Sequence, residues 1–329
     1  MKILFITSTR IGDAVLSTGL LAWLIERHPG ASVTIVCGPP AAALFEAAPG
    51  LERLIVLRKR PFDLHWPALW RACVGQRWDL VVDLRRSLLP WLLAARSRRR
   101  LPRADAPVHR VALIARTFDL DPPPAPRLWT APTHERAAAQ LLAGTPGKEE
   151  PLLAVGPTAN WTDKTWPAER FAKLIGHLTG PQGALAGARV AVICGPEESE
   201  TAWPVLAAVP EAQRIALAGA PLLTVFALLR RAALFVGNDS GLMHMAAAAG
   251  VPTLGLFGPS DERLYAPWGE HTAVARGAES ARELIARAKE GAQGSLMESL
   301  EVAAVETAAR KLLARAESAA RAQSVARSP

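Results

Sequence analysis

Short apolar runs of strand length alternate with helix-patterned segments along most of this chain, and the alternation restricts its fold more than any other feature. In the first part, such runs lie at residues 3–6, 33–37, 54–57 and 80–84, with helical spacing between them. Strands that alternate with helices form a parallel sheet with helices on its faces. The first part is therefore predicted to be a doubly wound, Rossmann-like domain.

The same alternation begins again after a proline-rich segment. Its apolar runs lie at residues 152–155, 189–193, 214–217, 234–236 and 253–256. The change in composition between 119 and 151, with four prolines from 122 to 126, indicates a linker. We predict a first domain over 1–145 and a second over 151–290. Over 291–329 we predict a C-terminal helix, with an apolar stripe at 299–316, that packs across the domains and ends in a frayed tail.

Composition excludes several classes of protein. With 329 residues, 50% of them hydrophobic, the chain is long enough for two domains with cores of their own. The cysteines Cys37, Cys73 and Cys194 form no CxxC pair, so neither a disulfide framework nor a zinc site is predicted. No apolar run approaches the roughly 20 residues of a membrane-spanning helix, and the N-terminus lacks the features of a signal peptide. We expect a cytoplasmic protein.

The charge of the chain favours an anionic partner. The formal net charge is +8 and the pI is near 10. Nucleic acid, an anionic membrane surface and a phosphorylated substrate all fit this charge. Seven arginines gather between residues 85 and 103. They either bind substrate phosphates or form a solvated or structural basic face.

A ligand site is expected in the loops after the strands, because ligands of open α/β sheets bind beyond the carboxyl ends of the strands. The loop at 7–13 carries Gly12, which allows close backbone approach, and Asp13, a carboxylate at the start of a helix. Asp13 either presents its carboxylate to the cleft or serves only as the helix cap.

Two loops of the second half suit a nucleoside diphosphate. In the loop at 156–167, Thr158, Asn160 and Lys164 precede a helix and can bind a diphosphate, and the alternative is a surface loop with a solvated lysine. In the loop at 194–198, Glu197 and Glu198 can accept hydrogen bonds from ribose hydroxyls. Acidity at a helix start explains these glutamates nearly as well.

The stretch at 237–244 is the most informative. If Asp239 caps the following helix, Ser240 and Gly241 present unpaired N–H groups in its positive first turn, which is an anion site. His244 lies four residues after Ser240 and can donate to a phosphate oxygen, although a core histidine is the alternative.

Other motifs argue against competing classes. No P-loop lysine motif is present, and no GxGxxG follows the first strand, which weakens the ATPase and dehydrogenase hypotheses. An Asp-Leu-Asp triplet at 119–121 lies in the proline-rich segment and is interpreted as a coincidence rather than a metal site.

Ile-Gly-Asp at 11–13, Lys-Thr-Trp-Pro at 164–167 and Asn-Asp-Ser-Gly at 238–241 together make the chain resemble glycosyltransferase family 9. The best-known members of that family are heptosyltransferases. The resemblance implies a GT-B fold, with two facing Rossmann-like domains that bind the acceptor and the nucleotide donor respectively. It also implies that Asp13 is the base and that Lys164 and the helix start contact the donor diphosphate.

We assign the site residues accordingly. The catalytic residues are Asp13 and Lys164. The donor-binding residues are Thr158, Asn160, Lys164, Glu197, Glu198, Asp239, Ser240, Gly241 and His244. The acceptor-binding residues are Arg10, Gly12, Arg85 and Arg86. No metal ion and no cofactor are expected.

The predicted reaction is an inverting, metal-independent transfer of heptose or a related sugar. The resemblance implies ADP-heptose as donor and a lipopolysaccharide core or similar glycan as acceptor. Phosphorylated lipid A inner core would match the arginines, with peripheral contact at the inner membrane, and no nucleic acid partner is expected. Two alternatives are a sugar-nucleotide epimerase or phosphorylase on the same scaffold and a non-enzymatic module that binds a nucleotide sugar or RNA.

Overall fold

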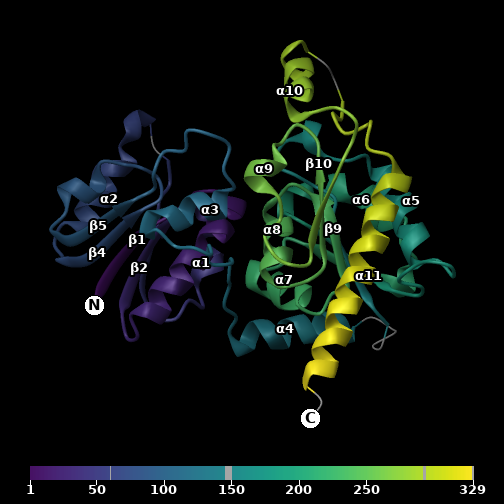
Figure 1. The fold of residues 1–329 in the computed structure, drawn as a ribbon, viewed down its shortest axis with the longest axis horizontal. Coiled ribbons are helices and arrows are strands. Elements are labelled where there is room, and N and C mark those ends of the chain that lie inside the picture. The colour runs from purple at the N-terminus through teal and green to yellow at the C-terminus, as the bar shows by residue number, and fades with distance from the viewer. Residues whose placement is uncertain (60, 145–149, 292–293, 328–329) are drawn as a thin grey trace. The chain divides into compact units, whose positions relative to one another are not determined.

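The computed structural model describes residues 1–59, 61–144, 150–291 and 294–327. The chain divides into two compact units, Met1–Ala131 and Pro132–Pro329, and each is built on a parallel sheet (Figure 1). The predicted α/β class with two Rossmann-like domains is therefore confirmed.

The first unit contains a five-stranded sheet in the order β3-β2-β1-β4-β5, and every neighbouring pair is parallel. The strands are β1 (Lys2–Ile6), β2 (Ser32–Cys37), β3 (Leu51–Val56), β4 (Trp78–Asp83) and β5 (Ala95–Arg100). The helices are α1 (Ile11–Arg27), α2 (His65–Cys73) and α3 (Arg110–Ala115), with 3-10 turns η1 (Pro39–Phe45), η2 (Pro61–Asp63), η3 (Leu89–Leu92) and η4 (Arg116–Phe118). The four predicted strands are confirmed. The edge strand β5 was not predicted, because four of its six residues are arginines.

The proline-rich segment is part of the first unit. A Cβ on Gly19 of α1 would lie 2.3 Å from the Pro124 carbonyl oxygen, so only glycine permits this approach. The Arg127 N–H donates to Thr18 Oγ1 at 2.9 Å. The boundary between the compact units, after Ala131, lies within the predicted linker 119–151, but its residues up to Arg127 pack on α1.

The second unit contains a six-stranded parallel sheet in the order β11-β10-β9-β6-β7-β8. The strands are β6 (Leu152–Gly156), β7 (Arg189–Cys194), β8 (Arg214–Ala218), β9 (Leu234–Asn238), β10 (Thr253–Phe257) and β11 (Thr272–Arg276). The helices are α4 (Pro132–Ala143), α5 (Ala168–Thr179), α6 (Ser199–Ala207), α7 (Leu222–Leu229), α8 (Gly241–Ala248), α9 (Glu262–Tyr265), α10 (Ala281–Lys289) and α11 (Val302–Arg327), with turns η5 (Thr162–Lys164), η6 (Pro196–Glu198) and η7 (Glu211–Gln213). The edge strand β11 was not predicted.

Helix α4 belongs to the second unit, although the sequence suggested a boundary between 145 and 151. It packs against α7, and Glu135 pairs with Arg230 at 3.1 Å and with Arg231 at 3.3 Å. The compact units accordingly divide before α4. Residues 145–149, where the predicted boundary begins, lie outside the described residues.

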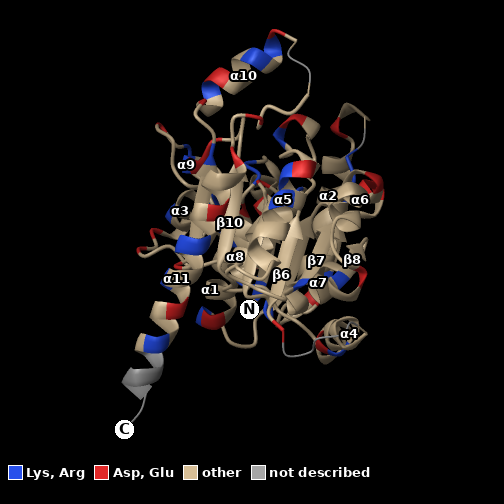
Figure 2. Ribbon diagram, turned by 90° about the vertical axis from the view of Figure 1, so that its right-hand side faces the viewer, with Lys and Arg blue, Asp and Glu red and all other residues tan. Residues whose placement is uncertain are grey.

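Helix α11 packs on the second unit. Its residues Val305, Ala309 and Leu312 are buried in the same core as Phe171 of α5, and Glu306 lies 2.8 Å from His177 Nδ1. The helix continues to Arg327, beyond the predicted stripe, so the segment expected to fray is helical. Basic and acidic residues are interspersed along α10 and α11 (Figure 2). Within the described part of the chain, no helix has both the length and the apolarity that crossing a bilayer requires.

Candidate active site

Two predicted loops of the first unit meet at one edge of its sheet. Strands β1 and β4 are neighbours, with Ile6 opposite Asp83, and the Leu84 N–H donates to the Ile6 carbonyl at 2.9 Å. The carboxyl ends of parallel strands share an edge. The loop that leads to Asp13 and the loop of Arg85 and Arg86 therefore begin side by side.

Tight packing fixes the loop after β1. A Cβ on Gly38 would lie 2.5 Å from the Thr9 Cα, so glycine is required there. The Thr7 N–H donates to the Val36 carbonyl at 2.8 Å, and the Thr7 and Ser17 hydroxyls lie 2.7 Å apart. The chain thus enters α1 along a defined path.

Asp13 is the third residue of α1, whereas the N-cap is Arg10, which is exposed and makes no side-chain capping bond. The interpretation of Asp13 as a plain N-cap was therefore wrong. Its Oδ2 lies 3.5 Å from Ser8 Oγ, and its Oδ1 lies 3.7 Å from Arg110 Nε of α3. Asp13 remains partly exposed, so its carboxylate can accept a proton from a bound hydroxyl.

Arg110 is a residue that sequence reasoning missed. Its Nε is buried and makes no hydrogen bond to the residues that the structure describes. Its guanidinium places a positive charge next to the Asp13 carboxylate. No motif surrounds Arg110, and it reaches Asp13 only because α3 packs against α1.

The buried Asp83 shapes the loop after β4. Its carboxylate accepts hydrogen bonds from the Arg85 and Ser87 N–H groups at 2.8 and 2.6 Å. The Arg85 guanidinium lies 5.1 Å from the ring centroid of Trp66. Partial burial lowers the pKa of Arg85, and the Asp83 carboxylate opposes this shift. Arg86 is half-buried at a positive φ of 59°, and its carbonyl accepts a bond from Arg100.

Among the remaining arginines of the 85–103 stretch, some make contacts within the first unit and others are exposed to solvent. Arg98 donates to the Pro90 and Leu93 carbonyls, both at 2.7 Å, and is a structural residue. Arg99 lies over the Phe118 ring at 5.6 Å. Arg96 and Arg103 are exposed. The structural alternative therefore holds for Arg98.

In the second unit, the structure brings Lys164 and Asp239 together from different loops. Lys164 ends η5 in the loop after β6, and its Nζ lies 3.2 Å from Asp239 Oδ2 after β9. The two side chains are only 13% and 12% exposed. Since β6 and β9 are neighbours in the sheet, their loops meet at its carboxyl edge. Lys164 is therefore an ion-paired residue and not the solvated lysine of the alternative.

The fully buried Asn238 anchors the loop of Lys164. Its Oδ1 accepts from the Trp166 N–H at 3.0 Å, and its Nδ2 donates to the Pro157 carbonyl at 2.8 Å. The Trp166 indole donates to the Leu300 carbonyl at 2.8 Å. Sequence analysis included Asn238 in the motif at 238–241 but assigned it no function. The feature that could have revealed it is a polar residue at the end of an otherwise apolar strand.

Ser240, rather than Asp239, is the N-cap of α8, so the predicted cap was off by one residue. The Ser240 Oγ is buried and has no hydrogen-bond partner among the residues that the structure describes. Gly241 opens the helix, whose first N–H groups lack partners within the helix. His244 is buried, with its Nε2 4.0 Å from Asp239 Oδ1. This helix start combines an unpaired hydroxyl with a positive dipole end, which suits an anion.

The remaining residues assigned to donor binding differ in their surroundings, since some are hydrogen-bonded and others are exposed. The Thr158 hydroxyl donates to Glu198 Oε2 at 2.7 Å, and the Gly195 N–H donates to the same oxygen at 2.8 Å. Glu198 is therefore held between β6 and β7, while Glu197 and Asn160 are exposed. Sequence reasoning missed Arg276 at the end of β11, which donates to the Gly258 and Ser260 carbonyls.

A curated relative covers nearly the whole chain. Lipooligosaccharide heptosyltransferase 2 of Haemophilus influenzae is 25% identical over 337 residues, which is 91% of this chain and 95% of that protein.

Two solved structures share the fold. The family 9 glycosyltransferase of Veillonella parvula has a TM-score of 0.78 and 23% identity, and the match covers 95% of this chain and 97% of that one. The ADP-heptose lipopolysaccharide heptosyltransferase II of Escherichia coli has a TM-score of 0.73 and 21% identity, with 96% and 100% covered. These likenesses confirm the predicted GT-B fold.

The family model described as glycosyltransferase family 9 (heptosyltransferase) matches residues 73–291, which include parts of both units. The resemblance seen in the sequence motifs is thereby confirmed, and so is the prediction of an enzyme. The chain belongs to glycosyltransferase family 9 and is a heptosyltransferase-like glycosyltransferase.

Proposed function

We propose that this enzyme transfers heptose, or a related sugar, from ADP-heptose to a lipopolysaccharide core or a similar glycan. Family membership supports a sugar transfer, and the names of the matched Haemophilus and Escherichia proteins support this donor and acceptor class. The proposed enzyme acts in the cytoplasm.

The observation that carries the proposal is the arrangement at the start of α8. Lys164, held by its ion pair with Asp239, lies beside this helix start, where the buried Ser240 hydroxyl and the first N–H groups of α8 can donate hydrogen bonds. A departing diphosphate gains negative charge in the transition state, so these groups stabilise that state more than the ground state. The Asn238 anchor supports the proposal because it fixes the loop of Lys164 before the donor binds.

In the proposed reaction, an acceptor hydroxyl oxygen bonds to the anomeric carbon while the bond from that carbon to the diphosphate oxygen breaks. The electron pair leaves with the nucleoside diphosphate, and Asp13 takes the hydroxyl proton. Attack opposite the leaving group inverts the anomeric configuration. The charge of the leaving group is stabilised by Lys164 and the helix start, without a metal ion or cofactor.

The acceptor proposed for the first unit is an anionic glycolipid such as phosphorylated lipid A inner core. Arg85 and Arg86 lie beside the loop of Asp13 and can pair with phosphate oxygens. The exposed N-cap Arg10 and the partly buried Gly12, in the first turn of α1, complete the proposed acceptor side.

The proposal is tested with the purified chain, ADP-heptose and a heptose-deficient core glycolipid. We expect a glycolipid one heptose heavier by mass spectrometry, with release of ADP and no loss of rate in EDTA. ADP-heptose should raise the melting temperature, because a ligand of the folded state stabilises it. If ADP-heptose is consumed when no acceptor is present, the enzyme is instead an epimerase or a phosphorylase. Binding without turnover would replace it by a binding module, and EDTA inhibition reversed by magnesium would overturn metal independence.

A further inference from the structure

Five large apolar side chains are exposed on α2 and η3 of the first unit and on the residues that flank them, Val74 after α2 and Leu88 before η3. Trp70, Val74, Leu88, Trp91 and Leu92 are between 38% and 72% exposed. The Val74 N–H donates to the Trp70 carbonyl at 2.8 Å, and the Trp91 N–H donates to the Leu88 carbonyl at 3.1 Å, so each set shares one helical turn. The Trp70 indole donates to the Leu92 carbonyl at 3.1 Å and joins the two sets. We call these five residues the α2–η3 patch.

The core of the first unit does not need the patch. Leu69 and Cys73 of α2, and Leu89 and Leu93 next to the exposed residues of η3, fill the core beneath. Both elements are therefore apolar on their buried side and again on their outer side. A contiguous exposed apolar surface of this kind marks an interaction site.

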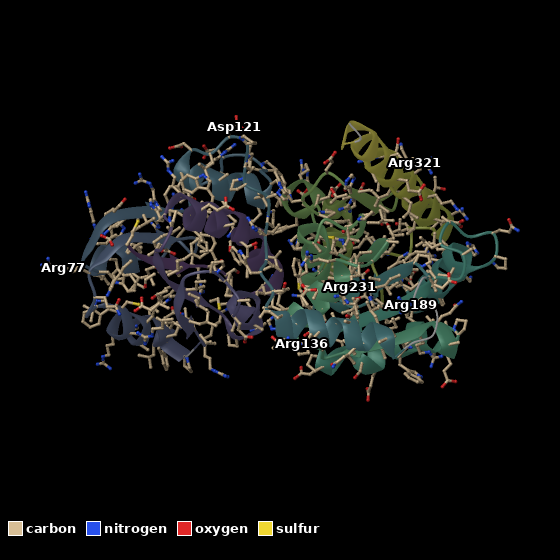
Figure 3. The ribbon with its side chains drawn as sticks, turned by 90° about the horizontal axis from the view of Figure 1, so that it is seen from below. Arg77, Asp121, Arg136, Arg189, Arg231 and Arg321 are labelled. Atoms are coloured by element: carbon tan, nitrogen blue, oxygen red, sulfur yellow. The ribbon has the colours of Figure 1, made fainter. Side chains whose placement is uncertain are left out.

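The patch lies in the most basic part of the chain. Residues 58–103 contain twelve arginines or lysines against three aspartates, an excess larger than the net +8 of the whole chain. The Arg98 guanidinium lies 5.9 Å from the Trp91 ring centroid, so β5 reaches the patch. Arg96 is two residues from Arg98 along β5 and shares its side of the sheet. Arg71 follows Trp70 and is exposed, and Arg77 extends away from the first unit (Figure 3).

We propose that the α2–η3 patch docks the enzyme on an anionic lipid bilayer. Tryptophans favour the boundary between headgroups and acyl chains, where Leu88 and Leu92 would lose contact with water. The surrounding arginines are attracted to lipid phosphates. This pattern fits RNA less well, because base stacking uses aromatic faces and leaves the aliphatic residues exposed. The proposal goes beyond the proposed reaction, since it requires neither donor nor acceptor.

The test is flotation of the full chain with vesicles of phosphatidylcholine alone or mixed with phosphatidylglycerol. We expect binding to the anionic vesicles that weakens with salt, because salt screens charges. Leu88→Ser/Trp91→Ser/Leu92→Ser should weaken binding more than 10-fold, since three large apolar side chains would no longer be removed from water at the membrane. Arg71→Gln/Arg96→Gln should weaken it about 5-fold for each arginine removed.

Matched controls come from exposed residues of the second unit: Trp203→Ser for the apolar change and Arg136→Gln/Arg282→Gln for the charges. Both should bind anionic vesicles like the natural chain, and circular dichroism should show every variant folded. Equal binding by the natural chain and the triple variant would overturn the proposal. So would a dimer in sedimentation that the triple variant abolishes while vesicle binding persists, or RNA binding that only the patch variants lose.

Discussion

The two units share an architecture but differ in charge. The first unit, Met1–Ala131, contains nineteen arginines or lysines and ten acidic residues, whereas the second contains nineteen and twenty. The second unit nevertheless holds the site proposed for the donor diphosphate. There, one lysine and one helix start are fixed by buried contacts, while the first unit spreads many partly exposed arginines around its loops. A local site for a small anion therefore needs no net positive charge, and a basic surface suits larger anionic partners.

The first prediction tests the base of the first unit. Asp13→Asn keeps the shape of the side chain but cannot accept a proton, so kcat should fall by about 100-fold to 10,000-fold. Because Arg10 is the N-cap, the fold should persist, and ADP should still raise the melting temperature. The exposed Asp105→Asn is the control. A near-normal kcat with an early melt would reduce Asp13 to a structural partner of Arg110.

The second prediction tests the localised site of the second unit. Lys164→Met should lower kcat/KM by about 100-fold to 1,000-fold, as expected for loss of one group that stabilises developing charge. It also leaves Asp239 without its ion-pair partner at Lys164, which should lower the melting temperature. Lys164→Met/Asp239→Asn should recover the melting temperature but not the rate. The exposed Lys173→Met is the control, and full activity of the single variant would contradict the donor site.

The third prediction tests the diffuse charge of the first unit. Arg85→Gln/Arg86→Gln should raise the acceptor KM about 10-fold or more for each arginine that pairs with a phosphate, since a charge-assisted hydrogen bond contributes about 1.5–3 kcal/mol. Donor affinity, measured by calorimetry with ADP, should stay the same. Arg27→Gln, exposed at the end of α1, is the control. If only ADP binding weakens, the functions of the two units are the reverse of those proposed.

The fourth prediction concerns the three cysteines buried in the cores of the two units, which we expect not to react with a thiol reagent in the folded chain. Burial raises the pKa of Cys37 to about 12 and that of Cys73 to about 11, and it also raises the pKa of Cys194. Since the thiolate is the reactive form, none should react with a disulfide reagent at pH 8. As the urea concentration rises, labelling of Cys37 and Cys73 measures unfolding of the first unit, and labelling of Cys194 measures unfolding of the second. Rapid labelling without urea would show that a core opens readily.

Most of the fold could be predicted because the central strands, and also the edge strands β3 and β8, carry apolar runs. The strands that sequence reasoning missed, β5 and β11, both lie at sheet edges. Edge strands tolerate charged side chains, so the apolar pattern that reveals a central strand is absent in β5. The packing of residues 122–127 on α1 depends on Gly19, whose partner is distant in sequence.

The candidate site could be predicted only in part. A motif local in sequence, such as 238–241, indicated an anion site at a helix start, although the cap was misplaced by one residue. Arg110 and Arg276 reach their partners through tertiary packing, which leaves no local signal. Likewise, the pairing of Lys164 with Asp239 depends on β6 lying next to β9.

The ion pair between Lys164 and Asp239 affects how this site would bind an anion. Removing an ammonium from water costs several kcal/mol, and here most of that dehydration takes place during folding. If the proposed diphosphate binds here, it meets a lysine that has already lost most of its hydration shell, and it competes with the Asp239 carboxylate instead of with bulk water. Preference among anions should accordingly follow how well each can share or replace that carboxylate, so a multivalent phosphate is favoured over a monovalent ion such as chloride.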